Sequence, residues 1–164
     1  MDLYILRHGK AGRRDGSSTD DRKRPLTAKG RKEMEEIALW IASSGIEPDW
    51  IATSPLVRAR ETAEIVARTL GLMDRLEEWE ELAFGPGPEA ILGKLSAKGP
   101  DTRGMVVGHE PLLSETIAIL ISSDGSARIA LAKGGLAKIR EVQFDPSPSG
   151  ELEWLVPPKF ILRS

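Results

Sequence analysis

Three short and largely apolar segments, each followed by a polar motif, have the length of buried strands: 3–6, 49–52 and 104–107. Segments with a helical spacing of apolar residues lie between and after these runs. Strands that alternate with helices favour an α/β sheet with mostly parallel strands. Three further strand candidates follow without helices between them: 127–131, 136–144 and 152–155. We therefore expect hairpin connections and an antiparallel edge, with helices on both faces of the sheet in a three-layer fold.

Capping residues mark where the predicted helices begin. Thr27 has the side chain of an N-cap and precedes a stripe of apolar residues at helical spacing. Pro55 lies at the first turn of the next predicted helix, and two more helices are expected at 89–97 and 111–121. Residues 10–25 are polar, contain glycine and show no helical or strand period, which predicts a surface loop.

The composition excludes several classes of protein. The 23 basic and 25 acidic side chains give a net charge of −2, so no overall positive field attracts nucleic acid or an anionic membrane. Cysteine is absent, which excludes disulfides, thiolate metal ligands and a cysteine nucleophile. No basic leader precedes the first run, and no apolar stretch approaches the roughly 18 residues of a membrane span, so we expect a cytoplasmic protein. The length of 164 residues and the lack of a linker predict one domain over 1–164.

Two of the three strand ends carry the only histidines of the chain. Arg7 and His8 follow the first run, Ser54 and Arg58 follow the second, and His109 follows the third. Because the carboxyl ends of parallel strands meet at one edge of an open α/β sheet, we expect these side chains to line one pocket. The pocket would contain two imidazoles, two guanidinium groups and the N-terminus of a helix.

This combination suits phosphoryl transfer, which depends mainly on positioning and on stabilising charge. Arginine binds phosphate through two parallel N–H donors, and the first N–H groups of a helix point toward an anion. A neutral imidazole can supply the attacking nitrogen, and cationic neighbours disfavour the imidazolium form of His8. His109 can donate a hydrogen bond to a phosphoryl oxygen, so the two histidines need different environments.

Four segments in this order resemble the histidine phosphatase superfamily: Arg7-His8-Gly9, Arg24-Pro25-Leu26-Thr27, Ser54-Pro55-Leu56-Val57-Arg58-Ala59 with Glu61-Thr62-Ala63, and Gly108-His109-Glu110-Pro111. The short length is similar to the SixA-type phosphohistidine phosphatases of that superfamily. The resemblance implies a phosphoglycerate-mutase-like fold and no cofactor. It also implies that His8 is the phosphorylated nucleophile, that Arg7 and Arg58 bind phosphate, and that His109 is the second histidine of the phosphate pocket.

Several residues near these segments have two interpretations. Gly9 and Ser54 are candidates for binding phosphate, although Ser54 could also act only as an N-cap. Lys10 follows the Arg-His-Gly motif, where the short branch often has an acidic residue, and either adds a cation or points to solvent. A mixed set of charges in the predicted loop either contacts a protein substrate or keeps the loop hydrated: Arg13, Arg14, Asp15, Asp20, Asp21, Arg22, Lys23 and Arg24.

The leaving group decides whether the enzyme needs a general acid. Larger members of the superfamily usually have a carboxylic acid that protonates a departing alkoxide. Glu80, Glu81 and Glu89 are candidates by position and Glu110 is a carboxylate at a helix start, but none has a context that matches that acid. An imidazole is far less basic than an alkoxide and needs such an acid less. The sequence therefore favours a phosphohistidine-carrying protein as the substrate.

Other functions remain open at this stage. A phosphatase of small phosphate esters would use Glu80 or Glu81 as its acid. A module that binds phosphorylated ligands without turnover would use the same pocket, although it needs no nucleophile. Zinc binding is a rival use of His8 and His109, but no matched spacing of histidine, cysteine or carboxylate ligands accompanies them, so we expect no metal.

Overall fold

The computed structural model describes residues 1–13 and 18–163. The helices and strands have these bounds in chain order: β1 (Asp2–Arg7), α1 (Ser18–Lys23), α2 (Ala28–Ser43), β2 (Trp50–Thr53), α3 (Val57–Leu70), β3 (Leu76–Glu78), α4 (Pro88–Ser96), β4 (Arg103–Gly108), α5 (Leu112–Ile121), β5 (Leu136–Gln143) and β6 (Ser149–Val156). Short 3-10 helices occupy Met73–Arg75 (η1), Glu80–Leu82 (η2) and Pro158–Phe160 (η3).

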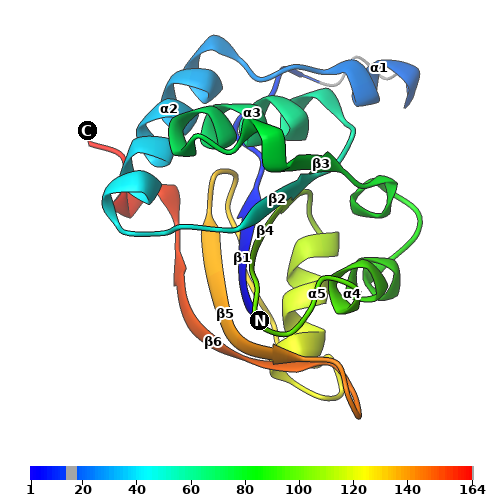
Figure 1. Ribbon diagram of the computed structural model, residues 1–164. Coiled ribbons are helices and arrows are strands. Elements are labelled where there is room, and N and C mark those ends of the chain that lie inside the picture. The colour runs from blue at the N-terminus through cyan, green and yellow to red at the C-terminus, as the bar shows by residue number, and fades with distance from the viewer. Residues whose placement is uncertain (14–17, 164) are drawn as a thin grey trace.

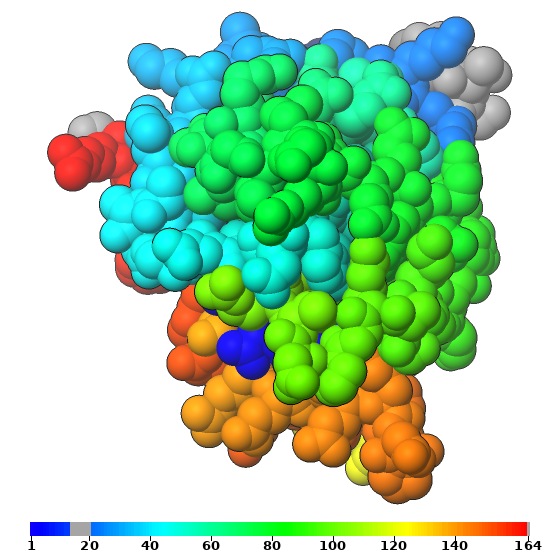
Figure 2. Space-filling view, viewed as in Figure 1, coloured from blue at the N-terminus to red at the C-terminus, as the bar shows by residue number. Residues whose placement is uncertain are grey.

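The six strands form one mixed sheet in the order β3-β2-β4-β1-β5-β6. β1, β2, β3 and β4 pair in parallel, whereas β5 pairs antiparallel with both β1 and β6. The β5–β6 hairpin forms one edge of the sheet (Figure 1), and its connecting turn extends beyond the helices in the space-filling view (Figure 2). The prediction of a mostly parallel sheet with an antiparallel edge is confirmed.

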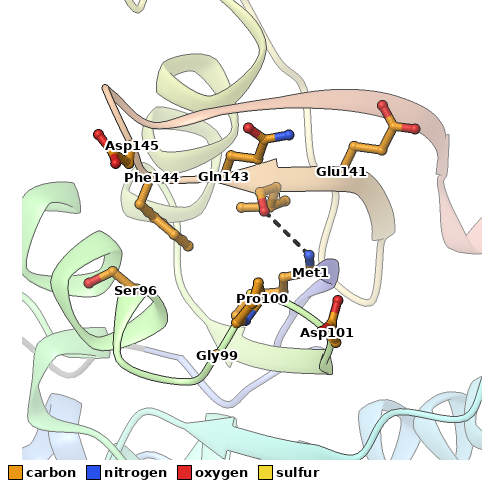
Figure 3. Close-up of a pocket in the computed structure, with 10 residues that line it drawn as sticks. Met1, Ser96, Gly99, Pro100, Asp101, Glu141, Gln143, Phe144 and Asp145 are labelled. Atoms are coloured by element: carbon orange, nitrogen blue, oxygen red, sulfur yellow. Dashed lines mark hydrogen bonds between the residues drawn. The ribbon is translucent and has the colours of Figure 1, made fainter.

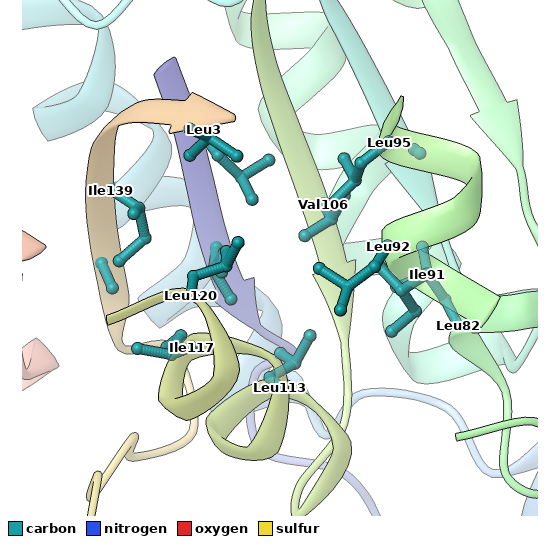
Figure 4. Close-up of a cluster of buried hydrophobic side chains, with 14 of the residues drawn as sticks. Leu3, Leu82, Ile91, Leu92, Leu95, Val106, Leu113, Ile117, Leu120 and Ile139 are labelled. Atoms are coloured by element: carbon teal, nitrogen blue, oxygen red, sulfur yellow. The ribbon is translucent and has the colours of Figure 1, made fainter. Parts of the chain in front are cut away.

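Helices cover both faces of the sheet, as the alternation of side chains along β1 requires. Leu3 and Ile5 belong to a buried cluster that includes residues of α4 and α5. Tyr4 and Leu6 belong to a second cluster with residues of α2 and α3. Figure 4 shows the first cluster, in which Leu3 and Val106 of adjacent strands pack with the α4 and α5 side chains. The three-layer prediction is therefore confirmed.

Two predictions from the sequence are wrong: part of the predicted surface loop is helical, and one predicted strand does not form. Residues 18–23 of the predicted surface loop form α1, and Ala11 pairs with Leu26 in an isolated antiparallel bridge. Residues 127–131 form no strand, because β5 takes the place beside β1 and the carbonyl of Leu131 accepts a hydrogen bond from the Arg7 side chain. Arg14 and Asp15 lie outside the described residues.

Smaller differences concern helix and strand boundaries. α3 begins at Val57 with Leu56 as its N-cap, two residues later than Pro55 suggested. No feature of the sequence predicts β3, which has three residues and pairs with β2 alone. Over the ranges that the structure describes, no helix is long and apolar enough to cross a membrane.

Candidate active site

The carboxyl ends of β1, β2 and β4 lie side by side, and the predicted site residues follow them. The backbone N–H of His8 donates to the Gly108 carbonyl at 3.1 Å, and the N–H of Ser54 donates to the Val107 carbonyl at 3.0 Å. These bonds continue the sheet pairing one residue beyond β1 and β2. His109 comes directly after β4, so the sheet itself brings the three segments to one edge.

The ring of His8 is buried and fixed in one tautomer. Its Nδ1 lies 2.7 Å from the carbonyl oxygen of Gly9. A carbonyl oxygen can only accept a hydrogen bond, so Nδ1 carries the proton and Nε2 presents a lone pair. The Nε–H of Arg58 points to this Nε2 at 3.4 Å. The unprotonated Nε2 of His8 therefore lies next to the guanidinium group of Arg58.

The rings of His8 and His109 lie next to each other in the site, with their centroids 5.1 Å apart. Burial is the main cause that lowers the pKa of each ring to about 3, and the charges of Arg58 and Arg7 lower both pKa values further. In His8 the hydrogen bond to Gly9 opposes this shift, and in His109 the charge of Asp21 does so. Both imidazoles are therefore neutral near pH 7.

His109 connects the end of β4 to the turn after β2. Its Nε2 and the hydroxyl of Ser54 lie 2.8 Å apart, and the Ser54 hydroxyl accepts the N–H of Leu56 at 3.2 Å. Ser54 is thus not the N-cap of α3 but the residue that orients the His109 ring. The Nδ1 of His109 is buried and has no hydrogen-bond partner within residues 1–13 and 18–163. Most buried polar groups have a hydrogen-bond partner, so this ring nitrogen is an exception in the fold.

Arg58 is the most deeply buried cation of the site, with 2% of its side chain exposed. Its Nη1 donates to the Asp21 carbonyl at 2.8 Å, and its Nη2 lies 3.4 Å from the Asp21 carboxylate. The other carboxylate oxygen of Asp21 pairs with Arg24 at 3.0 Å. From the sequence, Asp21 is only one of the charges of a predicted loop, because nothing local to α1 shows that this helix lies against α3.

Arg7 and Lys133 add two further cations. The Nη1 of Arg7 donates to the Leu131 carbonyl at 3.0 Å, and burial lowers the pKa of its guanidinium. Burial also lowers the pKa of Lys133, with Arg7 as the largest of several cationic neighbours that act in the same direction. Lys10 instead pairs with Glu33 at 2.9 Å. Lys133 is exposed, and its charge acts on Arg7, Arg58 and His8, so it lies near the cationic pocket at a position for which the sequence carries no signal.

Gly9 is held by a hydroxyl on α3. Its N–H donates to the Oγ1 of Thr62 at 3.1 Å, and the Thr62 hydroxyl donates to the Arg58 carbonyl at 2.7 Å. A side chain at Gly9 would have no room, because a Cβ there would lie 2.6 Å from the Cγ of Met34. The backbone N–H of Gly9 is thus already engaged in the fold.

The four candidate acids lie in different surroundings. The side chain of Glu80 is 73% exposed and pairs with Arg22 at 3.5 Å. Glu110 accepts hydrogen bonds from the backbone and the hydroxyl of Ser114, which places it at the start of α5. Glu81 lies in η2 and Glu89 in the first turn of α4. None of the hydrogen bonds and ion pairs found between described residues joins these carboxylates to a pocket histidine.

Neither a metal cluster nor the cavity at the other end of the sheet offers a competing site. Among the described residues, no group of three histidine or carboxylate side chains could hold a metal ion. A cavity of about 700 Å³ lies at the amino ends of β1 and β4, where Met1, Asp101 and Glu141 contribute to its wall (Figure 3). It is therefore at the opposite end of the sheet from the two histidines.

Comparisons with known proteins show which family and which structures this chain is similar to. The model of the histidine phosphatase superfamily (branch 1) matches residues 3–88. An uncharacterized protein of Picosynechococcus sp. is 32% identical over 99% of both chains. The phosphohistidine phosphatase SixA of Escherichia coli is 28% identical over 96% of this chain and 94% of its own length. The structure of the protein histidine phosphatase SixA complexed with tungstate superposes with a TM-score of 0.86 and 26% identity, over 99% of this chain and all of the other.

Proposed function

This chain belongs to the histidine phosphatase superfamily, and on that premise we propose that it hydrolyses phosphohistidine carried by a protein, through a covalent intermediate on His8. The observation that carries the proposal is the tautomer of His8. Gly9 holds the proton on Nδ1, so the lone pair of Nε2 is directed into the pocket. The low pKa of the ring, about 3, keeps this nitrogen unprotonated at neutral pH.

The reaction has two steps. In the first, a bond forms between the Nε2 of His8 and phosphorus while the bond to the leaving group breaks and its electron pair departs with that group. In the second, water attacks the phosphorus, inorganic phosphate leaves, and its departure returns the lone pair to Nε2. Arg7, Arg58 and Lys133 stabilise the charge on the phosphoryl oxygens in both steps. The buried Nδ1 of His109 supplies a hydrogen bond to one of those oxygens when it carries the ring proton.

The surroundings of the carboxylates support phosphohistidine as the substrate. Glu80 pairs with Arg22, and Glu110 is bonded to Ser114. Both carboxylate oxygens of Asp21 form ion pairs, one with Arg24 and the other with Arg58, so this carboxylate is engaged by arginines and not directed at a leaving group. A phosphohistidine ring that is protonated on its other nitrogen departs as neutral imidazole and needs no acid from the enzyme. The similarity to SixA proteins points in the same direction.

Trapping the intermediate tests the nucleophile. Labelled substrate mixed with the wild type and quenched in denaturing conditions should leave label on the protein, and His8→Asn should retain none. His109→Asn is the matched control, because it alters the second imidazole of the same pocket. It should slow labelling without abolishing it. Equal labelling of wild type and His8→Asn would refute the assignment.

Turnover of different substrates tests the leaving group. We expect a higher kcat/KM for a phosphohistidine protein than for sugar phosphates. The alternative, a phosphatase of small esters, gains support if esters are preferred and if Glu80→Gln or Glu81→Gln abolishes that activity. Binding of phosphorylated ligands without release of phosphate from any substrate would favour the non-catalytic module.

A further inference from the structure

We propose that Phe84 forms an aromatic platform at the mouth of the pocket, against which the departing imidazole of the substrate stacks. The identity of this leaving group rests on the proposed function. The ring of Phe84 lies 5.0 Å from that of His109, centroid to centroid, with 39° between their planes. The guanidinium carbon of Arg58 lies 5.8 Å from the centroid of the same ring. Phe84 therefore touches the two buried side chains that line the phosphate site.

Phe84 remains accessible although it contacts these buried groups. It is 46% exposed, whereas Leu82 and Ala83, directly before it, are 0% and 2% exposed. The chain thus buries two apolar residues and then turns a large ring toward solvent. Single exposed apolar residues are common on protein surfaces, so exposure alone indicates no ligand. The contact of this exposed ring with two buried residues of the pocket places it where a bound substrate would meet it.

The turn that presents Phe84 is anchored to the sheet. The N–H of Trp79 donates to the carbonyl of Thr53 at the end of β2, at 2.9 Å. The N–H groups of Leu82 and Ala83 close the 3-10 turn with bonds of 3.0 and 2.9 Å. Gly85 follows with a φ of 118°, which a residue with a side chain rarely adopts. The backbone that carries the ring is therefore held by the fold before any substrate binds.

The chemistry of the leaving group explains why a ring is useful there. In phosphohistidine the imidazole is bonded directly to phosphorus through nitrogen, so a planar ring lies within one bond of the phosphoryl group. Aromatic rings pack in offset or tilted arrangements with centroids about 4.5–7 Å apart. When the substrate ring is protonated, the face of Phe84 also attracts its positive charge. A sugar hydroxyl on tetrahedral carbon offers neither interaction.

The platform makes a prediction that separates contact with the leaving group from support of the pocket. Phe84→Leu should lower kcat/KM for a phosphohistidine protein and for phenyl phosphate by about 2- to 13-fold, the range expected for one aromatic pair. The inhibition constant of inorganic phosphate should not change, because phosphate has no leaving group. Phe84→Tyr, which retains the ring, should restore turnover. Phe160→Leu, which removes a ring that is 73% exposed in η3, is the matched control and should stay within about twofold of wild type.

Each other result contradicts the platform in a recognisable way. An equal change in kcat/KM and in the inhibition constant of phosphate would mean that Phe84 only supports His109 and Arg58. No change in either would mean that the substrate does not touch the ring. If the wild type hydrolyses phenyl phosphate but not phosphohistidine, the proposed function fails, whereas the comparison of Phe84→Leu with Phe84→Tyr on phenyl phosphate still tests the platform.

Discussion

Thr62 and Thr116 differ by one hydrogen bond, which allows its contribution to be measured. Both side chains are fully buried, and each hydroxyl donates to the carbonyl one turn earlier in its own helix, Arg58 at 2.7 Å and Leu112 at 2.8 Å. Thr62 also accepts the N–H of Gly9 at 3.1 Å. No corresponding N–H donates to Thr116 among the hydrogen bonds of the described residues. Substitution of both threonines by valine therefore isolates the bond to Gly9.

Valine keeps the shape of threonine but leaves the N–H of Gly9 buried without a partner. Such a group costs about 1–3 kcal/mol. In Thr116→Val no buried N–H loses its partner, because the Leu112 carbonyl still accepts its hydrogen bond within the helix. This substitution should therefore lower the free energy of unfolding much less. We expect Thr62→Val to unfold at a lower temperature than Thr116→Val by about 2–12 °C, given about 2–4 °C per kcal/mol for a chain of this size. Thr62→Ser keeps the hydroxyl and should recover most of the difference.

The same bond should matter for catalysis, because the Gly9 carbonyl orients the Nδ1 proton of His8. A loosened Gly9 would misalign Nε2, so Thr62→Val should lower kcat by about 10-fold or more and leave the inhibition constant of phosphate nearly unchanged. The reasoning is refuted if the two valine variants differ by less than about 0.5 kcal/mol in urea denaturation. It also fails if Thr62→Val keeps the kcat of wild type.

Three further predictions concern pH, packing and charge. The folded pKa of about 3 for both pocket histidines, against about 6.5 when unfolded, means that the unfolded chain binds more protons below pH 6.5. Stability should therefore fall as the pH falls from 6.5 toward 3, by up to about 1.4 kcal/mol per pH unit for each ring, and urea midpoints should fall less steeply in His109→Asn. Gly30→Ala would place a Cβ 2.1 Å from the carbonyl oxygen of Lys10 and should cost about 1–3 kcal/mol, whereas Gly93→Ala meets no atom within 4 Å in α4 and should gain about 0.5–1 kcal/mol in thermal denaturation. Lys133→Ala should lower kcat/KM by about 2- to 5-fold, with a smaller effect in high salt, while Lys10→Ala should stay within about twofold because its amine already pairs with a carboxylate.

Features with a local signal were predictable from the sequence. Thr27 caps α2 as expected, since its hydroxyl accepts the N–H of Gly30 at 2.9 Å. The apolar runs at 3–6 and 104–107 lie in β1 and β4, which are adjacent and parallel. Because parallel strands share their carboxyl edge, the strand assignments predicted that His8 and His109 lie at one edge of the sheet. The direct pairing of β1 with β4, which brings the two rings together, was not predicted.

Features that depend on contacts across the fold were not predictable. α1 has six residues without an apolar stripe, and its place is fixed by contacts between Asp21 and Arg58 that join residues 37 apart. Lys133 and Phe84 lie on turns whose sequences give no sign of where they point. Residues 127–131 have the composition of a strand, but a strand also needs a free neighbour in the sheet, and β5 occupies that place.

The contact between Asp21 and Arg58 also bears on how the proposed enzyme binds and releases phosphate. A guanidinium that is only 2% exposed is costly without a counter-charge, and the Asp21 carboxylate at 3.4 Å supplies one. A phosphate that binds the same N–H groups must therefore compete with a carboxylate that belongs to the protein. When phosphate binds, it replaces the Asp21 carboxylate as the anion beside Arg58. The net free energy of binding is therefore smaller than it would be for phosphate at an arginine without a counter-charge. Because the product of the second step is itself a phosphate anion, the same exchange favours its release and leaves Arg58 in place for the next substrate.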